Sequence, residues 1–181
     1  MASPLQKIIF LDRDGTINVD DGFVHDIASW RFVEGAIEGL KGLNKAGFKL
    51  VVITNQSGIG HGMYQEADMN LVHDHMREEL RREGVSLAAI VFCPHRRDAG
   101  CDCRKPKTGM AEQVKKQLGA FALYDSWTIG DKEADVGFGQ KVGTKTALIR
   151  SRYWQENNLV DEPDLVVDSL AEFARRVTEN E

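Results

Sequence analysis

Short apolar runs alternate along the chain with longer segments in which apolar residues return every three or four positions. The first pattern is typical of buried strands and the second of amphipathic helices. We expect strands at Lys7–Asp12, Lys49–Thr54, Ala89–Cys93, Trp127–Asp131 and Lys145–Ile149. We expect helices at Glu34–Ala46, Glu66–Glu83, Gly109–Leu118, Glu133–Val142 and Ser169–Val177. Strands that alternate with helices predict an α/β fold, a parallel sheet with helices on both faces.

Composition narrows the class of protein. The 181 residues contain no repeat, low-complexity tract or linker that would divide the chain, so we expect one domain over residues 1–181. The formal net charge of −5 argues against nucleic acid or an anionic membrane as the main partner, since both attract basic surfaces. No apolar run reaches membrane-spanning length, and the first residues lack the apolar core of a signal peptide. The expected location is the cytoplasm, and the expected state is a monomer.

Polar residues follow four of the five predicted strands, at the edge of the sheet where ligands bind in folds of this kind. They occur in the segments Asp12–Thr16, Thr54–Ser57, Cys93–His95 and Gly130–Asp131. An Asp-Gly pair alone is more often a turn, because both residues are common turn formers. Four polar strand ends that meet at one edge of the sheet instead indicate a site that performs chemistry.

The order of Asp12–Thr16, Thr54, Lys105 and Gly130–Asp131 resembles the four-motif pattern of the haloacid dehalogenase (HAD) superfamily over essentially the whole chain. The resemblance implies a Mg²⁺-dependent phosphomonoesterase that works through an aspartyl-phosphate. Such an enzyme needs a hard cation, because a phosphate monoester is anionic and resists attack by a carboxylate.

The superfamily pattern assigns a role to each matching residue. Asp12 would be the nucleophile, and Asp14 would be the general acid and then the general base. Thr54 would donate a hydrogen bond to the phosphate, and Lys105 would neutralise the charge that develops on it. The side chains of Asp12 and Asp131, with the backbone carbonyl of Asp14, would bind Mg²⁺.

Two further residues bear on these assignments. Lys107 is close enough to Lys105 to take its place. Asp135 would reach the metal site through water or hold Lys105 in place, or it would simply begin a helix, where an acidic side chain is favoured by the helix dipole.

All three cysteines of the chain lie within eleven residues, next to a histidine. Cys93, His95, Cys101 and Cys103 offer the sulfur and nitrogen ligands that Zn²⁺ prefers in tetrahedral geometry. A full set of four protein ligands leaves no open position for substrate, so we expect a structural zinc loop over residues 93–103.

Longer matches make the resemblance more specific. The stretches FLDRDGTIN, TNQSGI, CPH…CDCRKPKTGM and IGDKEAD resemble the heptose-bisphosphate phosphatases of the HAD superfamily. This family implies removal of the 7-phosphate from a small phosphorylated sugar, D-glycero-D-manno-heptose 1,7-bisphosphate, without a large cap domain. The residues expected to contact the substrate are Asp20, Asp21, Gly22, Phe23, Asn55, Gln56, Ser57, Arg104 and Lys132.

Three alternatives stay open at this point. Histidinol-phosphate phosphatases share the DRDGT motif, a similar zinc loop and the CRKP ending, and rank second. An inactive HAD-fold binding protein is a reading of another class, although it would be free to lose the acidic and basic site residues that are present here. A nucleic-acid end phosphatase uses similar chemistry but has the acidic balance of the chain against it. The chain also has Gly60-His61-Gly62 where the heptose family usually carries Ala-Arg-Gly, which bears on the exact sugar.

Other residues favour structural roles. His73 and His75 lie two positions apart on a predicted helix, so their side chains point to different faces. Tyr153 and Trp154 follow the last predicted strand and are expected to cover it.

Overall fold

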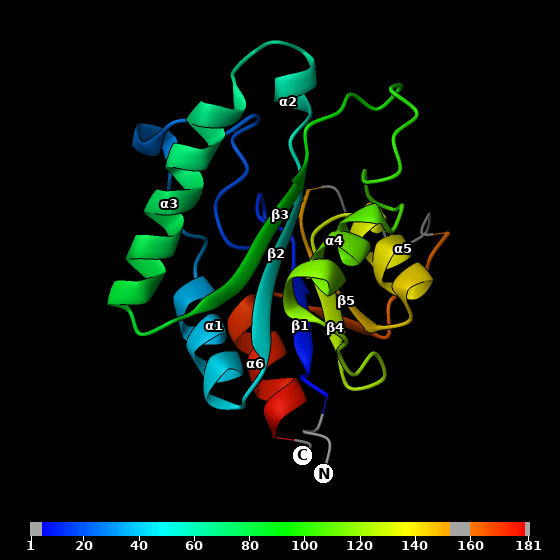
Figure 1. The fold of residues 1–181 in the computed structure, drawn as a ribbon. Helices are drawn as coiled ribbons and strands as arrows, with labels where there is room; N and C mark the ends of the chain where they lie inside the picture. The colour runs from blue at the N-terminus through cyan, green and yellow to red at the C-terminus, as the bar shows by residue number, and fades with distance from the viewer. Residues whose placement is uncertain (1–4, 153–159, 180–181) are drawn as a thin grey trace.

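Six parallel strands form one sheet in the computed structural model, which describes residues 5–152 and 160–179. The strands are β1 (Ile8–Leu11), β2 (Lys49–Asn55), β3 (Leu87–Cys93), β4 (Trp127–Gly130), β5 (Lys145–Ile149) and β6 (Leu165–Val167). Their spatial order is β3-β2-β1-β4-β5-β6 (Figure 1). The chain builds outward from β1 to β3 and then returns to the other side of β1 with β4. Ligands bind at such a switch point, outside the carboxyl ends of the strands.

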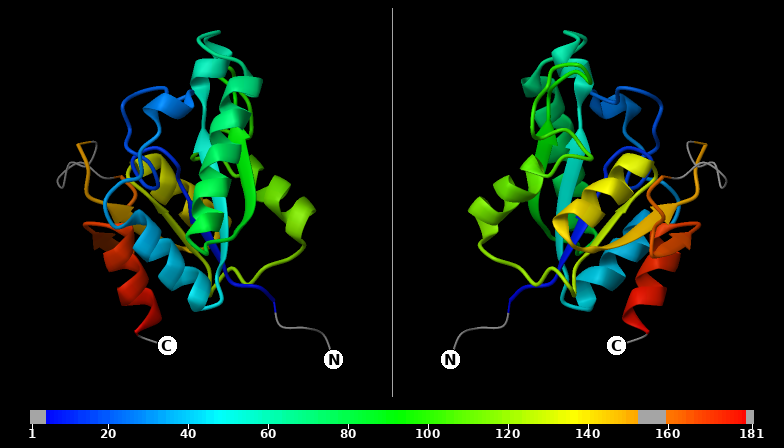
Figure 2. Two further views of the ribbon diagram at one scale, coloured as in Figure 1. Left: turned by 90° about the vertical axis from the view of Figure 1, so that its left-hand side faces the viewer. Right: turned by 90° about the vertical axis from the view of Figure 1, so that its right-hand side faces the viewer.

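Helices cover both faces of this sheet (Figure 2). They are α1 (Ala36–Lys45), α2 (Ser57–Gly60), α3 (Glu66–Arg82), α4 (Gly109–Leu118), α5 (Glu133–Val142) and α6 (Leu170–Thr178), with a 3₁₀ turn, η1, at Ile27–Ser29. Helices α1, α3 and α6 share one buried apolar cluster with the sheet, and α4 and α5 share another.

The central strand shows why the strand segments are continuously apolar. Ile9 and Leu11 face the cluster of α1, α3 and α6, whereas Ile8 and Phe10 face that of α4 and α5. Successive side chains of a strand point to opposite faces, so β1, which is covered on both faces, is apolar at each of its four positions. Phe10 also packs edge-on against Phe138 of α5, with ring centroids 5.6 Å apart.

The fold class expected from the sequence is confirmed, and the predicted strands and helices agree with the observed ones within two residues at each end. The sequence missed β6 and α2, which are three and four residues long and too short to show a periodic pattern. Tyr153 and Trp154 lie outside the described residues.

No large cap domain interrupts the described chain between β2 and α4. That stretch forms α2, α3, β3 and a loop over residues 94–108, which rises beyond the carboxyl end of β3 (Figure 1). Within residues 5–152 and 160–179, none of the helices has the length and apolar character needed to cross a bilayer.

Candidate active site

Asp12, Lys105 and Asp135 form a buried ionic cluster at the carboxyl end of β1. Lys105 Nζ donates to Asp12 Oδ1 at 2.8 Å, to Asp135 Oδ1 at 2.6 Å and to the carbonyl oxygen of Ile53 at 2.9 Å. Burial works to lower the pKa of Lys105, but the two carboxylates outweigh it and raise that pKa above its ordinary value. Lys107, the rival in the sequence, is exposed and donates to the carbonyl of Cys101 instead. The structure therefore brings Lys105, and not Lys107, to Asp12.

Asn55, at the end of β2, holds the backbone of Lys105 in place. Its Oδ1 accepts from the Lys105 amide at 3.0 Å, and its Nδ2 donates to the Lys105 carbonyl at 3.3 Å. The sequence indicated a phosphate contact for Asn55. These two bonds show a positioning contact that no pattern in the sequence suggested.

A third buried carboxylate, Asp131, lies next to the two carboxylates of this cluster. Oxygen atoms of Asp12, Asp131 and Asp135 all lie within 4.8 Å of one another. Burial, together with the nearby charge of Asp12, raises the pKa of Asp131 to about 7. The crowding also constrains Gly15, because its φ of +86° is left-handed and a Cβ there would lie 2.2 Å from Asp131 Oδ2.

This carboxylate group fits a magnesium ion, since Mg²⁺ prefers hard oxygen ligands. Asp135 is the least suited of the three, because Oδ1 accepts from Lys105 and Oδ2 accepts from the backbone amide of Lys132 at 3.1 Å. It thus holds Lys105 and also caps the start of α5. Asp12 and Asp131 remain as the pair best placed to hold the cation.

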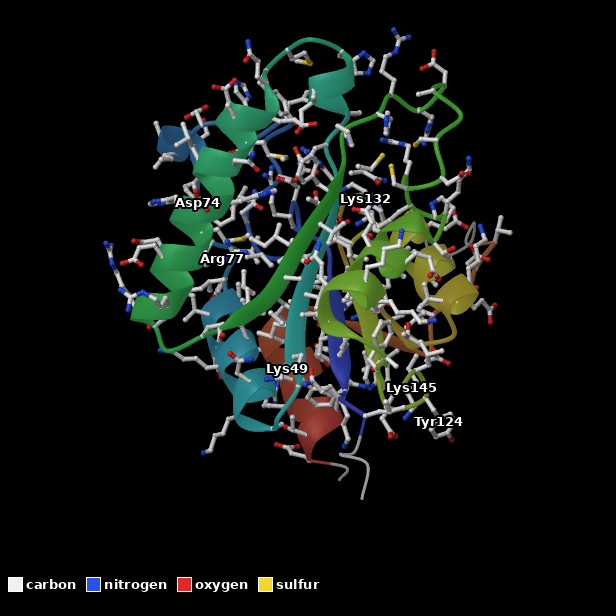
Figure 3. All side chains as sticks on the ribbon, in the orientation of Figure 1. Lys49, Asp74, Arg77, Tyr124, Lys132 and Lys145 are labelled. Atoms are coloured by element: carbon white, nitrogen blue, oxygen red, sulfur yellow. The ribbon has the colours of Figure 1, made fainter. Side chains whose placement is uncertain are left out.

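Lys132 carries a second positive charge into the site. Its Nζ lies 2.9 Å from Asp131 Oδ1, 3.2 Å from Asp20 Oδ2 and 3.4 Å from the carbonyl oxygen of Asp14. In Figure 3 it lies toward the carboxyl ends of the strands, whereas Lys49 and Lys145 lie at the opposite end of the sheet. Lys132 therefore ties the Asp20 loop to the carboxylate group.

The carboxylate of Asp14 is held by four hydrogen bonds. Arg13 donates to both of its oxygens, through Nε at 3.1 Å and Nη2 at 2.9 Å. Asn18 Nδ2 and Gln56 Nε2 donate at 3.0 Å and 2.9 Å. Sequence reasoning missed Arg13, because arginine is rarely buried completely and this one has no exposed surface. The only signal was its place between two carboxylates that were expected to be catalytic.

His73 supports Arg13 from α3. Its Nε2 lies 3.2 Å from Arg13 Nη1, and only 4% of the residue is exposed. Burial, and then the charge of Arg13, lower the pKa of His73 to about 3. The imidazole is therefore neutral at physiological pH and plays a structural part here.

This histidine makes folding depend on pH. The pKa is lower in the folded chain than the ordinary 6.5, so its contribution is present above pH 6.5 and is lost as pH falls toward 3. We expect His73 to cost about 2 kcal/mol of unfolding free energy between pH 7 and pH 5. Urea unfolding at both pH values should show a smaller difference in unfolding free energy in His73→Gln and an unchanged difference in the exposed control His61→Gln. An equal difference in wild type and His73→Gln would contradict the role given to His73.

A cavity of about 990 Å³ opens beside Asp12 and Asp14. Of the residues expected to contact substrate, eight line it: Asp20, Gly22, Phe23, Asn55, Gln56, Ser57, Arg104 and Lys132. Asp21 does not, because it pairs with Arg31 on the surface. Tyr64 and Arg97 also line the cavity, although neither belongs to a motif that pointed to the site.

The four predicted zinc ligands gather in the loop after β3. Cys93 Sγ lies 3.6 Å from Cys101 Sγ and 3.5 Å from His95 Nδ1, which is 3.2 Å from Cys103 Sγ. Tetrahedral zinc, with bonds of about 2.0–2.3 Å, needs ligand atoms about 3.3–3.8 Å apart. Burial and the neighbouring thiols raise the pKa of Cys103 to about 12 in the absence of a metal. The cluster of Cys93, His95, Cys101 and Cys103 is thus compatible with a zinc site.

Known proteins are similar to this chain in sequence and in fold. A family model described as Polynucleotide kinase 3 phosphatase matches residues 7–145. The chain is 38% identical over 178 residues to the D-glycero-beta-D-manno-heptose-1,7-bisphosphate 7-phosphatase of Photorhabdus laumondii, covering 93% of this chain and 94% of the relative. The enzyme of that name from Escherichia coli K12 is also 38% identical, with 93% and 92% covered.

A solved structure agrees with these relatives. The D,D-heptose 1,7-bisphosphate phosphatase from B. bronchiseptica, complexed with magnesium and phosphate, has a TM-score of 0.88 and 30% identity. The alignment covers 97% of this chain and 100% of that one. The chain therefore belongs to the family that the model describes and, over nearly its whole length, to the D-glycero-β-D-manno-heptose-1,7-bisphosphate 7-phosphatases of the HAD superfamily.

Proposed function

We propose that this protein removes the 7-phosphate of D-glycero-β-D-manno-heptose 1,7-bisphosphate through a phosphorylated Asp12, with Mg²⁺ bound. The observation that carries the proposal is the buried group of Asp12, Lys105 and Asp131 at the ends of separate segments of the chain. A nucleophilic carboxylate, a fixed cation and a second carboxylate for a metal are the parts that phosphoryl transfer needs.

In the first step an Asp12 oxygen attacks phosphorus and the bond from phosphorus to the C7 oxygen of the sugar breaks. Asp14, which must be protonated when this step begins, gives its proton to the departing oxygen, so the products are a sugar hydroxyl and an aspartyl-phosphate. Lys105, 2.8 Å from Asp12, stays charged and neutralises negative charge on the phosphoryl group as it is transferred.

In the second step water attacks the phosphorus of the aspartyl-phosphate. Asp14 accepts the proton of that water, and inorganic phosphate leaves, which restores the Asp12 carboxylate. Asp12, Asp131 and the Asp14 carbonyl would hold Mg²⁺, whose charge would offset the repulsion between carboxylate and phosphate.

The sugar assignment is supported by the relatives that cover nearly the whole chain, which are named for this substrate. The family model carries a nucleic-acid name and matches residues 7–145, whereas the relatives named for the heptose bisphosphate cover 93% of this chain. The cavity is large enough for a sugar bisphosphate, and Arg104 and Lys132 give its wall positive charge.

The matching assay measures phosphate release with Mg²⁺ from both anomers of the heptose bisphosphate, from histidinol phosphate and from a 3′-phosphorylated oligonucleotide. We expect kcat/KM for the β anomer to exceed that for histidinol phosphate and the oligonucleotide by at least about 100-fold. A higher kcat/KM for histidinol phosphate or for the oligonucleotide would overturn the substrate assignment.

We also propose that the Cys93–Cys103 loop binds one structural zinc ion. The loop runs directly into Arg104 and Lys105, and Arg104 Nη1 donates to the carbonyl of His95 at 3.3 Å. A metal that fixes this loop would therefore also fix the segment that carries Lys105.

Replacing Cys101 with serine is expected to remove the zinc. We expect about one zinc per chain in wild type, almost none in Cys101→Ser, and a loss of about 3 kcal/mol or more of unfolding free energy. Metal analysis and urea unfolding measure both quantities. The matched control is Asp102→Asn, whose side chain is fully exposed between the two cysteines and should keep the metal. Equal zinc contents in wild type and Cys101→Ser, whether full or near zero, would refute the site.

A further inference from the structure

The side chain of Gln56 uses all its polar atoms on protein partners. Its Nε2 donates to Asp14 Oδ2 at 2.9 Å and to Thr54 Oγ1 at 2.8 Å, and its Oε1 accepts from the Tyr64 hydroxyl at 2.6 Å. Gln56 is 3% exposed, Thr54 1% and Tyr64 6%. One buried amide therefore joins Asp14, the general acid of the proposed mechanism, to the hydroxyl of Thr54, which is proposed to donate to the phosphate.

The Tyr64 hydroxyl decides which way this amide points. A phenol that donates to Oε1 fixes the oxygen on the Tyr64 side, so both N–H groups must face Asp14 and Thr54. The opposite orientation would set an amide oxygen against the Asp14 carboxylate. Burial raises the pKa of Tyr64 to about 12, so the hydroxyl keeps the proton that it donates.

The orientation of Gln56 has a consequence for Thr54. Because Thr54 Oγ1 already accepts a hydrogen bond from Gln56, its own proton is directed elsewhere and can be donated to a phosphate oxygen. Thr54 lines the cavity next to Asp12 and Asp14. The amide of Gln56 thus contacts two groups with separate roles in the proposed reaction, Asp14 for proton transfer and Thr54 for a hydrogen bond to the phosphate.

From this geometry we infer that Tyr64 and Gln56 are positioning residues, which orient Asp14 for protonation of the sugar oxygen and Thr54 for its hydrogen bond to the phosphate. The inference rests on the proposed function, since it assigns the proton of the leaving group to Asp14. We call the Tyr64 hydroxyl and the Gln56 amide the Gln56–Tyr64 relay.

The surroundings keep Tyr64 in its place. A Cβ on Gly58 would lie 2.1 Å from the Tyr64 ring, so glycine is needed there for the ring to pack against the backbone. The His25 ring stacks on Tyr64 at a centroid distance of 4.6 Å and an angle of 1°. His25 belongs to the same loop as Gly22 and Phe23, which line the cavity. The loop that faces the substrate therefore touches the relay.

The test compares two classes of ester in Tyr64→Phe, which removes one hydroxyl. The sugar oxygen of an alkyl phosphate such as the heptose bisphosphate would leave as a strongly basic alkoxide, so it needs the acid. The 4-nitrophenolate of 4-nitrophenyl phosphate is a weak base and leaves without it. We expect Tyr64→Phe to lower kcat/KM for the sugar phosphate about tenfold, through kcat with KM within about twofold, and that for the aryl phosphate less than about twofold. kcat/KM is compared because it reports the first step for both esters.

Three further variants and substrates keep the result decisive. Gln56→Met removes the amide and should show the same split if Tyr64→Phe does not fold, which thermal unfolding detects. Tyr124→Phe, at a tyrosine that is 81% exposed, should match wild type with both esters. If wild type cleaves another alkyl phosphate but not the heptose bisphosphate, the comparison uses that ester, so failure of the sugar assignment is separate from failure of the relay. Equal losses with both esters, or no loss with either, would overturn the relay.

Discussion

Replacing Asp12 with asparagine is expected to lower kcat by at least about 10⁴-fold while the chain stays folded. The amide cannot attack phosphorus, and it also weakens the pair of carboxylates that fit Mg²⁺. Folding should survive, because Lys105 keeps Asp135 as a partner at 2.6 Å. Phosphate release under single-turnover conditions and thermal unfolding measure the two effects.

The matched control for this variant is Asp74→Asn. Asp74 lies on α3 (Figure 3), and its side chain is 75% exposed, so its neutralisation should leave turnover unchanged. Turnover of Asp12→Asn close to the wild-type rate would show that another group is the nucleophile.

Lys105→Met is expected to combine a loss of activity with a loss of stability. Without the ammonium, charge on the transferred phosphoryl group is not neutralised, and kcat should fall about 10³-fold. The same change leaves Asp12 and Asp135 as buried carboxylates without their cation, which should cost about 3–5 kcal/mol of unfolding free energy. Urea unfolding and steady-state kinetics measure the two losses independently.

A second substitution separates the two roles of Lys105. In Lys105→Met with Asp135→Asn, one of the two unpaired charges is gone, so part of the stability should return while activity stays low. Lys107→Met is the matched control, since the Lys107 side chain is 52% exposed and should cost less than about 1 kcal/mol. Recovery of activity in the double variant, or an equal loss in Lys107→Met, would contradict the role given to Lys105.

The fold could be predicted from the sequence because the central strands β1 and β2 are buried on both faces. Ile8–Leu11 and Leu50–Ile53 are unbroken apolar runs, and this pattern distinguishes them from the amphipathic helices that follow. β6 could not be found in this way. Only Val167 of its three residues is fully buried, so neither a run nor a period is visible.

The meeting of Asp12, Asp131 and Lys105 was also predicted. Asp12 and Asp131 follow strand ends, Lys105 occupies its place in the motif order, and the fold brings the three side chains together. The partners of individual polar side chains were not predictable. Asn55 holds the backbone of Lys105, and Gln56 joins Asp14 to Thr54, because of contacts that arise only when separate segments meet.

Arg13 shows the limit most clearly. It lies between two aspartates that were expected to be catalytic, and an arginine at such a position would ordinarily reach solvent. Its complete burial depends on His73 from α3 and on the carbonyl of Val24, which accepts from Nη2 at 2.6 Å. Those partners are distant along the chain, and no local pattern links them.

Phosphorylation of Asp12 itself can be detected by acid-quenched single turnover. Enzyme mixed with substrate and Mg²⁺ is quenched in acid within the first turnover, treated with hydroxylamine, digested and analysed by mass spectrometry. We expect a hydroxamate on Asp12 in wild type and none in Asp12→Asn. A hydroxamate on Asp14 or Asp131, or release of phosphate in the first turnover with no modified residue, would contradict it.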